Sequence, residues 1–109
     1  MRNEVLRLIV WLGDSRDVVR GFPREARDRI GAELYRLQIG LDPRHWKPMQ
    51  TVAPSAREIR VRAAGQFRLV YVSDSAGAIV VAHAFRKDTA KTSRPDRELA
   101  RQRLVASGR

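Results

Sequence analysis

Residues 57–91 read REIRVRAAGQFRLVYVSDSAGAIVVAHAFRKDTAK. Three runs rich in valine, isoleucine and aromatic residues are separated by Ala63–Gly65 and by Ser73–Gly77. Closely spaced runs joined by such turns predict an antiparallel meander. In the first run apolar residues alternate with charged ones, and successive side chains of a strand point to opposite faces. The stretch therefore predicts a small sheet with an apolar face and a face that presents arginines to a polyanion.

The faces of the next two strands follow from the same alternation. Arg68 shares a face with Val70 and Val72, where its guanidinium is partly desolvated. An arginine in such a place either pairs with a carboxylate such as Glu58 or waits for an anion. In the last strand, strict alternation places His83 on the same face as Ile79, Val81 and Phe85.

The charge of the chain is unevenly distributed. Residues 1–43 hold eight arginines against seven acids, whereas residues 44–109 hold fourteen basic residues against five acids, a net charge of +9. Almost all of the excess lies in the half that contains the meander. This pattern is typical of a nucleic-acid-binding surface. A merely basic surface in an arginine-rich protein and an acidic protein partner fit the same charge.

Size and composition limit the other classes of protein. The 109 residues suffice for a single domain, 1–109, with one modest core. There is no cysteine, so disulfides and cysteine-ligated metals are excluded, and we expect neither a metal site nor a small-molecule cofactor. No leader pattern or membrane-spanning stretch is evident, so we expect a cytoplasmic protein without a membrane partner.

The first part of the chain predicts a strand and two helices. Residues 5–12 are almost continuously apolar and predict a buried strand, and a short helix follows Asp14 and ends before Gly21. A longer helix is expected from about Pro23 to Ile39, because apolar residues recur every three or four positions. Residues 42–56 contain three prolines and predict a loop without regular structure. A last, basic helix is expected from residues 94 or 95 to 106.

The loop carries a run of residues suited to nucleic acid. Arg44, His45, Trp46 and Lys47 are consecutive. Basic residues beside an indole can hold phosphate while the ring stacks on a base. Trp46 could equally be an apolar plug that pins the loop to the domain.

The meander and the last helix together resemble a known protein family. The segments EIRVR, FRLVY and IVVAHAFRKDTAKT, followed by a basic helix, resemble the RelE/ParE superfamily of type II toxin-antitoxin toxins. The chain looks most like the HigB-like, phage-derived branch, in which a phrase close to HAFxKKTxKTP ends the last strand. The resemblance extends from the first strand through Leu104.

The resemblance implies a fold, an activity and partners. The fold would be α+β, with two N-terminal helices packed on one face of a small, mostly antiparallel sheet, and a C-terminal helix. The opposite, basic face would grip and cleave messenger RNA on the ribosome, and a cognate antitoxin, typically a helix-turn-helix protein, would neutralise the toxin. By position, Arg60, Arg68, Lys87 and Lys91 match basic residues of the family. Glu58 stands where RelE-type toxins tend to have a basic residue. Some RelE-type toxins also use a tyrosine near the start of the last helix, where this chain has Arg94 and Pro95.

Metal-free RNA cleavage needs charge stabilisation and proton transfer. Arg60, Arg68 and Lys87 can stabilise a phosphorane. Arginine cannot serve as the base, and His83 and His45 are the side chains that titrate near neutral pH without perturbation. His83 could instead be a core histidine. We expect Arg60, Arg68, His83 and Lys87 to be catalytic, with RNA contacts from Arg57, Arg62, Lys47, Trp46, Arg86 and Lys91.

The sequence thus predicts a ribosome-dependent endoribonuclease toxin, or mRNA interferase, that inhibits translation. Two alternatives remain open. One is a ParE-like toxin that poisons gyrase, since fold alone does not fix function within this superfamily. The other is a non-catalytic binding module or a decayed toxin that pairs with its antitoxin.

Overall fold

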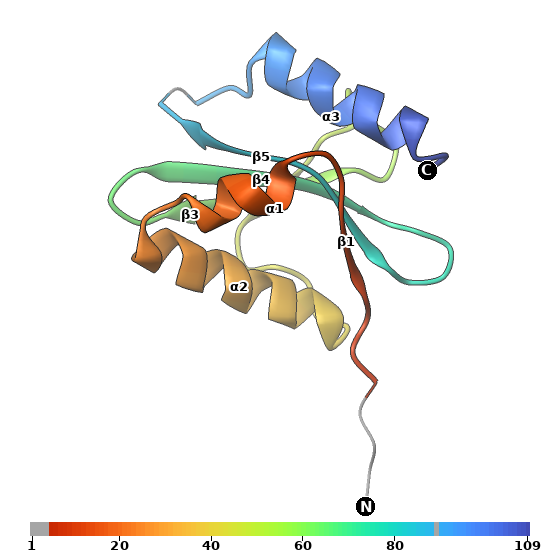
Figure 1. The fold of residues 1–109 in the computed structure, drawn as a ribbon, viewed down its shortest axis with the longest axis horizontal. Helices are drawn as coiled ribbons and strands as arrows, with labels where there is room; N and C mark the ends of the chain where they lie inside the picture. The colour runs from red at the N-terminus through yellow and green to blue at the C-terminus, as the bar shows by residue number, and fades with distance from the viewer. Residues whose placement is uncertain (1–4, 89) are drawn as a thin grey trace, which may run out of the picture.

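A computed structural model describes residues 5–88 and 90–109. The elements follow one another along the chain as a short strand, two helices, four strands and a final helix (Figure 1): β1 (Ile9–Trp11), α1 (Ser15–Arg20), α2 (Arg24–Gln38), β2 (Trp46–Pro48), β3 (Arg57–Arg62), β4 (Gln66–Ser73), β5 (Ile79–Lys87) and α3 (Arg94–Ala106). The predicted α+β class is confirmed.

The five strands form one sheet in the order β1-β5-β4-β3-β2. β2, β3, β4 and β5 pair antiparallel, whereas β1 pairs with β5 in parallel. The predicted meander forms its centre. Its second turn is closed by Asp74, whose Oδ1 accepts hydrogen bonds from the backbone N–H groups of Ala76 and Ala78. Asx turns of this kind explain why the Ser-Asp-Ser-Ala-Gly run separates two strands.

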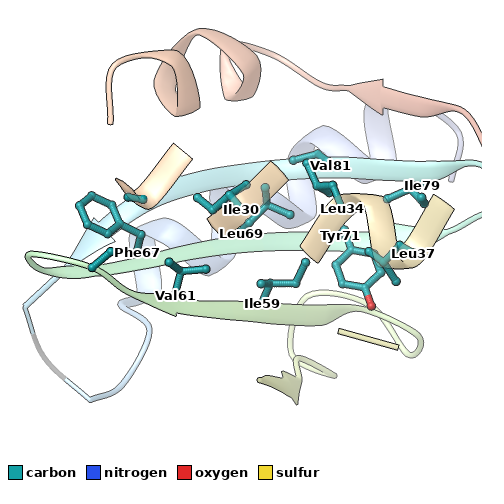
Figure 2. Close-up of a cluster of buried hydrophobic side chains, with 12 residues drawn as sticks. Ile30, Leu34, Leu37, Ile59, Val61, Phe67, Leu69, Tyr71, Ile79 and Val81 are labelled. Carbon is teal, nitrogen blue, oxygen red and sulfur yellow. The ribbon is translucent and has the colours of Figure 1, made fainter. Parts of the chain in front are cut away.

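One face of the sheet is covered by α2. The apolar stripe of α2, which includes Ile30, Leu34 and Leu37, packs on Ile59 and Leu69 of the meander. Figure 2 shows these side chains between the helix and the strands. α1 lies alongside β5 and adds Val19 to the edge of the same cluster. The two N-terminal helices therefore occupy the side that the sequence predicts.

The opposite face is not bare, because α3 packs on it. Ala100 and Leu104 are buried against Val72, Val80 and Ala82 in a second apolar cluster. The sequence led us to expect the face opposite the two N-terminal helices to be basic and to hold RNA. Burial of the apolar side chains of β4 and β5 requires a cover on both sides of the sheet, so α3 occupies that half.

Arg103 fixes the position of α3 against the turn between β1 and α1. Its Nη1 donates to the carbonyl oxygen of Ala82 at 3.1 Å, and its Nη2 donates to Oδ1 of Asp14 at 2.7 Å. Gly13, with φ +55°, allows this approach, since a Cβ at that position would collide with the guanidinium.

The neighbours expected on the face of His83 were wrong in part: Phe85 shares that face, whereas Ile79 and Val81 lie on the other. The register between β4 and β5 shifts between Val70 and Tyr71, so Val70 pairs with His83 but Tyr71 pairs with Val81. A bulge of this kind places two successive residues opposite one and interrupts the alternation. His83 consequently lies on the α3 side, stacked on Phe85 at a centroid distance of 4.9 Å, whereas Val81 belongs to the α2 side.

The prediction that residues 42–56 lack regular structure was also wrong in part. β2 (Trp46–Pro48) pairs with β3 at the edge of the sheet. Pro48 is compatible with this position because it ends an edge strand, where a missing N–H costs little. Within the described residues, no helix has the length and apolar character needed to cross a membrane.

Candidate nucleic-acid interface

The half of the second face that α3 leaves uncovered is hollowed into a cleft of about 600 Å³. β2, β3 and β4 supply most of its walls. Four basic side chains line it: Lys47, Arg60, Arg62 and Arg68. The other lining residues are His45, Val61, Gln66 and Ala90. Every charged residue in this wall is a cation, so the cleft is suited to an anion.

Arg60 and Arg68 form the centre of the cleft. They are directly paired across β3 and β4, so both project from the same face. The side chain of Arg60 is 29% exposed and that of Arg68 is 5% exposed. Arg60 is therefore the more accessible of the two for a ligand, and Arg68 forms the floor.

A buried carboxylate holds these two guanidiniums. Glu58 has no exposed surface, and its Oε1 accepts from Nη1 of Arg68 at 2.7 Å and lies 3.4 Å from Nε of Arg60. Thr92 donates its hydroxyl hydrogen to the other oxygen, Oε2. Arg68 also donates to Oε1 of Gln66 at 3.2 Å. The expected ion pairing of Glu58 is confirmed. The cluster of Arg60, Arg68 and Glu58 keeps a net charge of +1, because it has two guanidiniums and one carboxylate.

A second hollow of about 350 Å³ continues the cleft towards α3. The two hollows share Lys47, Arg60 and Ala90, and the second extends to Lys91 and Arg97. We refer to the two together as the basic groove. Within it, six cations follow a continuous path: Lys47, Arg60, Arg62, Arg68, Lys91 and Arg97. An extended polyanion could lie along such a path.

The two histidines occupy different environments. His45 is exposed and lines the groove. His83 is 8% exposed and lies beneath α3, where its Nε2 is 2.8 Å from Oδ1 of Asp96. Oδ2 of Asp96 accepts from the hydroxyl of Ser93 at 2.6 Å, at the N-terminus of the helix. Of the two, His45 is the one that a ligand in the groove could reach.

The remaining residues expected at the site are divided between the two faces. Lys47, Arg62 and Lys91 line the groove, and Lys87 is buried opposite Gln66, one of its lining residues. Three expected contacts lie on the α2 side instead: Arg57, Trp46 and Arg86.

Cation–π contacts account for these three side chains on the α2 side. The guanidinium of Arg57 lies 4.0 Å from the centroid of the Trp46 ring, and that of Arg86 lies 5.6 Å from the Phe67 ring. The indole is thus stacked within the domain, and its open role in base stacking finds no support in this geometry.

Sequence reasoning missed the residues that approach the groove from α3 and its preceding loop. Thr92 reaches the Glu58 carboxylate across 34 positions of sequence, and Nη1 of Arg97 donates to the carbonyl oxygen of Thr92 at 2.6 Å. Arg97 was not expected at the site, because no local pattern shows that the first turn of α3 lines the same hollow as β2.

No cluster of three or more metal-binding side chains occurs within residues 5–88 and 90–109.

Comparisons with known proteins place most of the chain in one family. Residues 17–105 match the family model described as "Phage derived protein Gp49-like (DUF891)". This range includes α2, the complete meander and nearly all of α3. A search among curated proteins returned no match.

Proposed function

This chain belongs to the Gp49-like family of phage-derived proteins, which is part of the RelE-like group of toxin-antitoxin proteins, and from this we propose that it is the toxin of a type II system. We assign it to the HigB-like branch and propose that it cleaves messenger RNA on the ribosome. Its partner would be a cognate antitoxin, most simply a helix-turn-helix protein.

The observation that carries the proposal is the pairing of Arg60 and Arg68 on the floor and wall of a basic groove. Guanidinium groups present several donors in a fixed plane and bind phosphate oxygens in pairs. An open groove that continues past Lys91 has room for a chain of nucleotides, whereas a closed pocket would select a single small molecule. These features support single-stranded RNA as the ligand.

The reaction that suits this set of residues is attack of a ribose 2′-hydroxyl on the adjacent phosphorus. The attacking oxygen loses its proton and the leaving 5′-oxygen gains one, while negative charge grows on the phosphorus oxygens. We propose that Arg60, Arg68 and Lys87 stabilise that charge. We propose His45, which lines the groove, as the proton acceptor in preference to His83, which is held under α3.

The test is to induce the protein without a partner and to map the 5′ ends of cellular messenger RNA. We expect new ends inside translated regions, and fewer in His45→Gln by about 100-fold or more, the usual contribution of a general base. Arrested growth with intact transcripts and broken DNA would instead identify a gyrase poison. Intact transcripts with normal growth would identify a non-catalytic or decayed protein.

Variants on exposed arginines give a cleaner test than Arg68→Ala. Arg68 is paired with a buried carboxylate, so its removal would also destabilise the fold. Arg62→Gln changes a groove residue that is exposed, and Arg27→Gln is a matched change on the exposed face of α2. We expect the first to weaken RNA binding and cleavage and the second to leave both unchanged. Equal effects of the two changes on RNA binding and cleavage would show that the groove has no specific role in the reaction.

A further inference from the structure

Most of the exposed large apolar side chains lie on two segments, before β1 and around the C-terminal end of α2, and none of these lines the basic groove. Of the eight large hydrophobic residues that the described chain exposes, six belong to the segment before β1 or to the C-terminal end of α2: Val5, Leu6, Leu8, Tyr35, Ile39 and Leu41. We call these six the apolar corner. The other two, Leu99 and Val105, lie on α3. Such a concentration of apolar surface marks an interaction site more often than chance exposure does.

Backbone contacts hold the two parts of the corner together. The N–H of Arg7 donates to the carbonyl oxygen of Gln38 at 3.1 Å, and Nε2 of Gln38 donates back to the carbonyl oxygen of Arg7 at 2.9 Å. Figure 1 shows the N-terminal segment leaving the sheet beside the end of α2. These two bonds fix Arg7 and Gln38 against each other, beside the exposed apolar residues.

A hollow of about 270 Å³ adjoins the corner and is suited to an anion. Arg7, Leu41, Arg57 and Tyr71 contribute to its wall. Tyr71 is 2% exposed, and its hydroxyl hydrogen has no acceptor among the described residues. Figure 2 shows this oxygen at the end of the apolar cluster, beside Leu37.

Charge and protonation in the hollow favour a carboxylate. Burial raises the pKa of Tyr71, with the nearby Arg57 guanidinium opposing part of the rise, so the hydroxyl remains a donor at neutral pH. Asp42 already pairs with Arg57 at 3.0 Å, and with Arg7 the three groups sum to one positive charge. A buried donor without an acceptor beside a net cation would be stabilised by an incoming anion.

We propose that the apolar corner and this hollow bind an extended peptide segment of a partner protein, a segment that carries a carboxylate between apolar side chains. The apolar residues of the segment cover the corner, and its carboxylate accepts from Arg7 and from Tyr71. That the partner is the antitoxin rests on the proposed function; the site itself rests on the geometry of the corner.

Two fluorescein-labelled peptides, Leu-Val-Glu-Leu-Val and Leu-Val-Gln-Leu-Val, test the site by anisotropy with the full chain. Loss of a charge-assisted hydrogen bond should weaken the glutamine peptide about tenfold or more. Tyr71→Phe and Arg7→Gln should weaken the glutamate peptide by about the same factor and remove its preference. Val5→Ser should also weaken it, whereas the matched change Val105→Ser on α3 should not.

Several results would overturn the site. These are equal binding of the two peptides, loss of binding in Arg62→Gln as large as in Arg7→Gln, or displacement of the peptide by self-association of the chain. Protection of the corner by single-stranded RNA would assign it to nucleic acid instead. Messenger cleavage by Tyr71→Phe and Arg7→Gln separates the two proposals, because neither change touches the groove. If the wild-type protein cleaves messenger RNA but does not bind the glutamate peptide, the peptide site is refuted and the proposed function is not.

Discussion

At the scale of single residues, Glu58 connects the stability of the protein to its site. A carboxylate with no exposed surface is costly unless donors replace its lost hydration. Arg60, Arg68 and Thr92 supply those donors from two strands and from the loop before α3. The same contacts hold the two guanidiniums at the groove, so one residue supports both the fold and the shape of the groove.

Glu58→Gln should therefore destabilise the protein by about 3 kcal/mol or more, because Arg68 is left buried without its counter-charge. Urea unfolding at neutral pH would measure the change. Glu98→Gln is the matched control, since Glu98 pairs with Arg101 on the exposed side of α3, and it should leave the midpoint nearly unchanged. Similar midpoints for both variants would show that the Glu58 network does not stabilise the fold.

Tyr71 predicts how stability depends on alkaline pH. Its pKa is raised in the folded protein above the ordinary value of 10.0, because burial disfavours the phenolate. The stabilising contribution is complete below the pKa of the unfolded chain and is lost as pH rises through the folded pKa. Tyr71→Phe lacks this loss, so its free energy of unfolding should fall less than that of the wild type above about pH 10. Parallel pH profiles would contradict the assignment.

At the scale of elements, α3 decides how much of the second face is open. Its N-terminus is capped by Ser93, whose hydroxyl oxygen accepts from the N–H of Asp96. Asp96 in turn contacts His83 of β5. Ala100 and Leu104 then seat the helix on β4 and β5. α3 is thus anchored along its length, and the basic groove begins beside its first turn, at Arg97.

Leu104→Ala should destabilise the protein by about 2–5 kcal/mol, as expected for a leucine removed from a packed core. Leu104 is 2% exposed, whereas its neighbour Val105 is 69% exposed, so Val105→Ala should have little effect. Thermal unfolding followed by circular dichroism would compare the two. A small effect of Leu104→Ala would mean that α3 is only loosely attached to the sheet.

At the scale of the whole molecule, charge and apolar surface are separated. The groove gathers cations of β2, β3, β4, α3 and the loop before α3, while six of the eight exposed large hydrophobic residues of the described chain lie before β1 and around the end of α2. The hollow next to the apolar corner and the groove also lie on opposite faces of the β3–β4 hairpin, since Arg57 and Tyr71 point towards α2 and Arg60 and Arg68 away from it. A nucleic acid and a protein segment could then bind at the same time.

Binding of a labelled RNA oligonucleotide should weaken with salt, and Arg62→Gln should lower the slope of log affinity against log salt concentration by about 0.7, the value for one phosphate contact on a single strand. Arg27→Gln should leave the slope unchanged. The glutamate peptide should not displace the RNA. Competition between the two ligands would show that they share one surface.

Much of this architecture follows from local sequence. The three- and four-residue spacing of apolar positions predicts α2, and alternation with turn residues predicts β3, β4 and β5, because these signals depend on neighbouring residues alone. The pairing of Glu58 with arginine was also predicted correctly. The common face of Arg60 and Arg68 follows from the same alternation once the two strands pair.

Other features depended on contacts between distant segments. The bulge that turns His83 towards α3, the short strand β2 and the packing of α3 on the second face have no local signature, since each is set by the need to bury both sides of the sheet. The convergence of Thr92 and Arg97 on the Glu58 network has the same origin. Sequence alone therefore determined which residues could carry positive charge to a sheet face, whereas tertiary packing decided which of them share the groove.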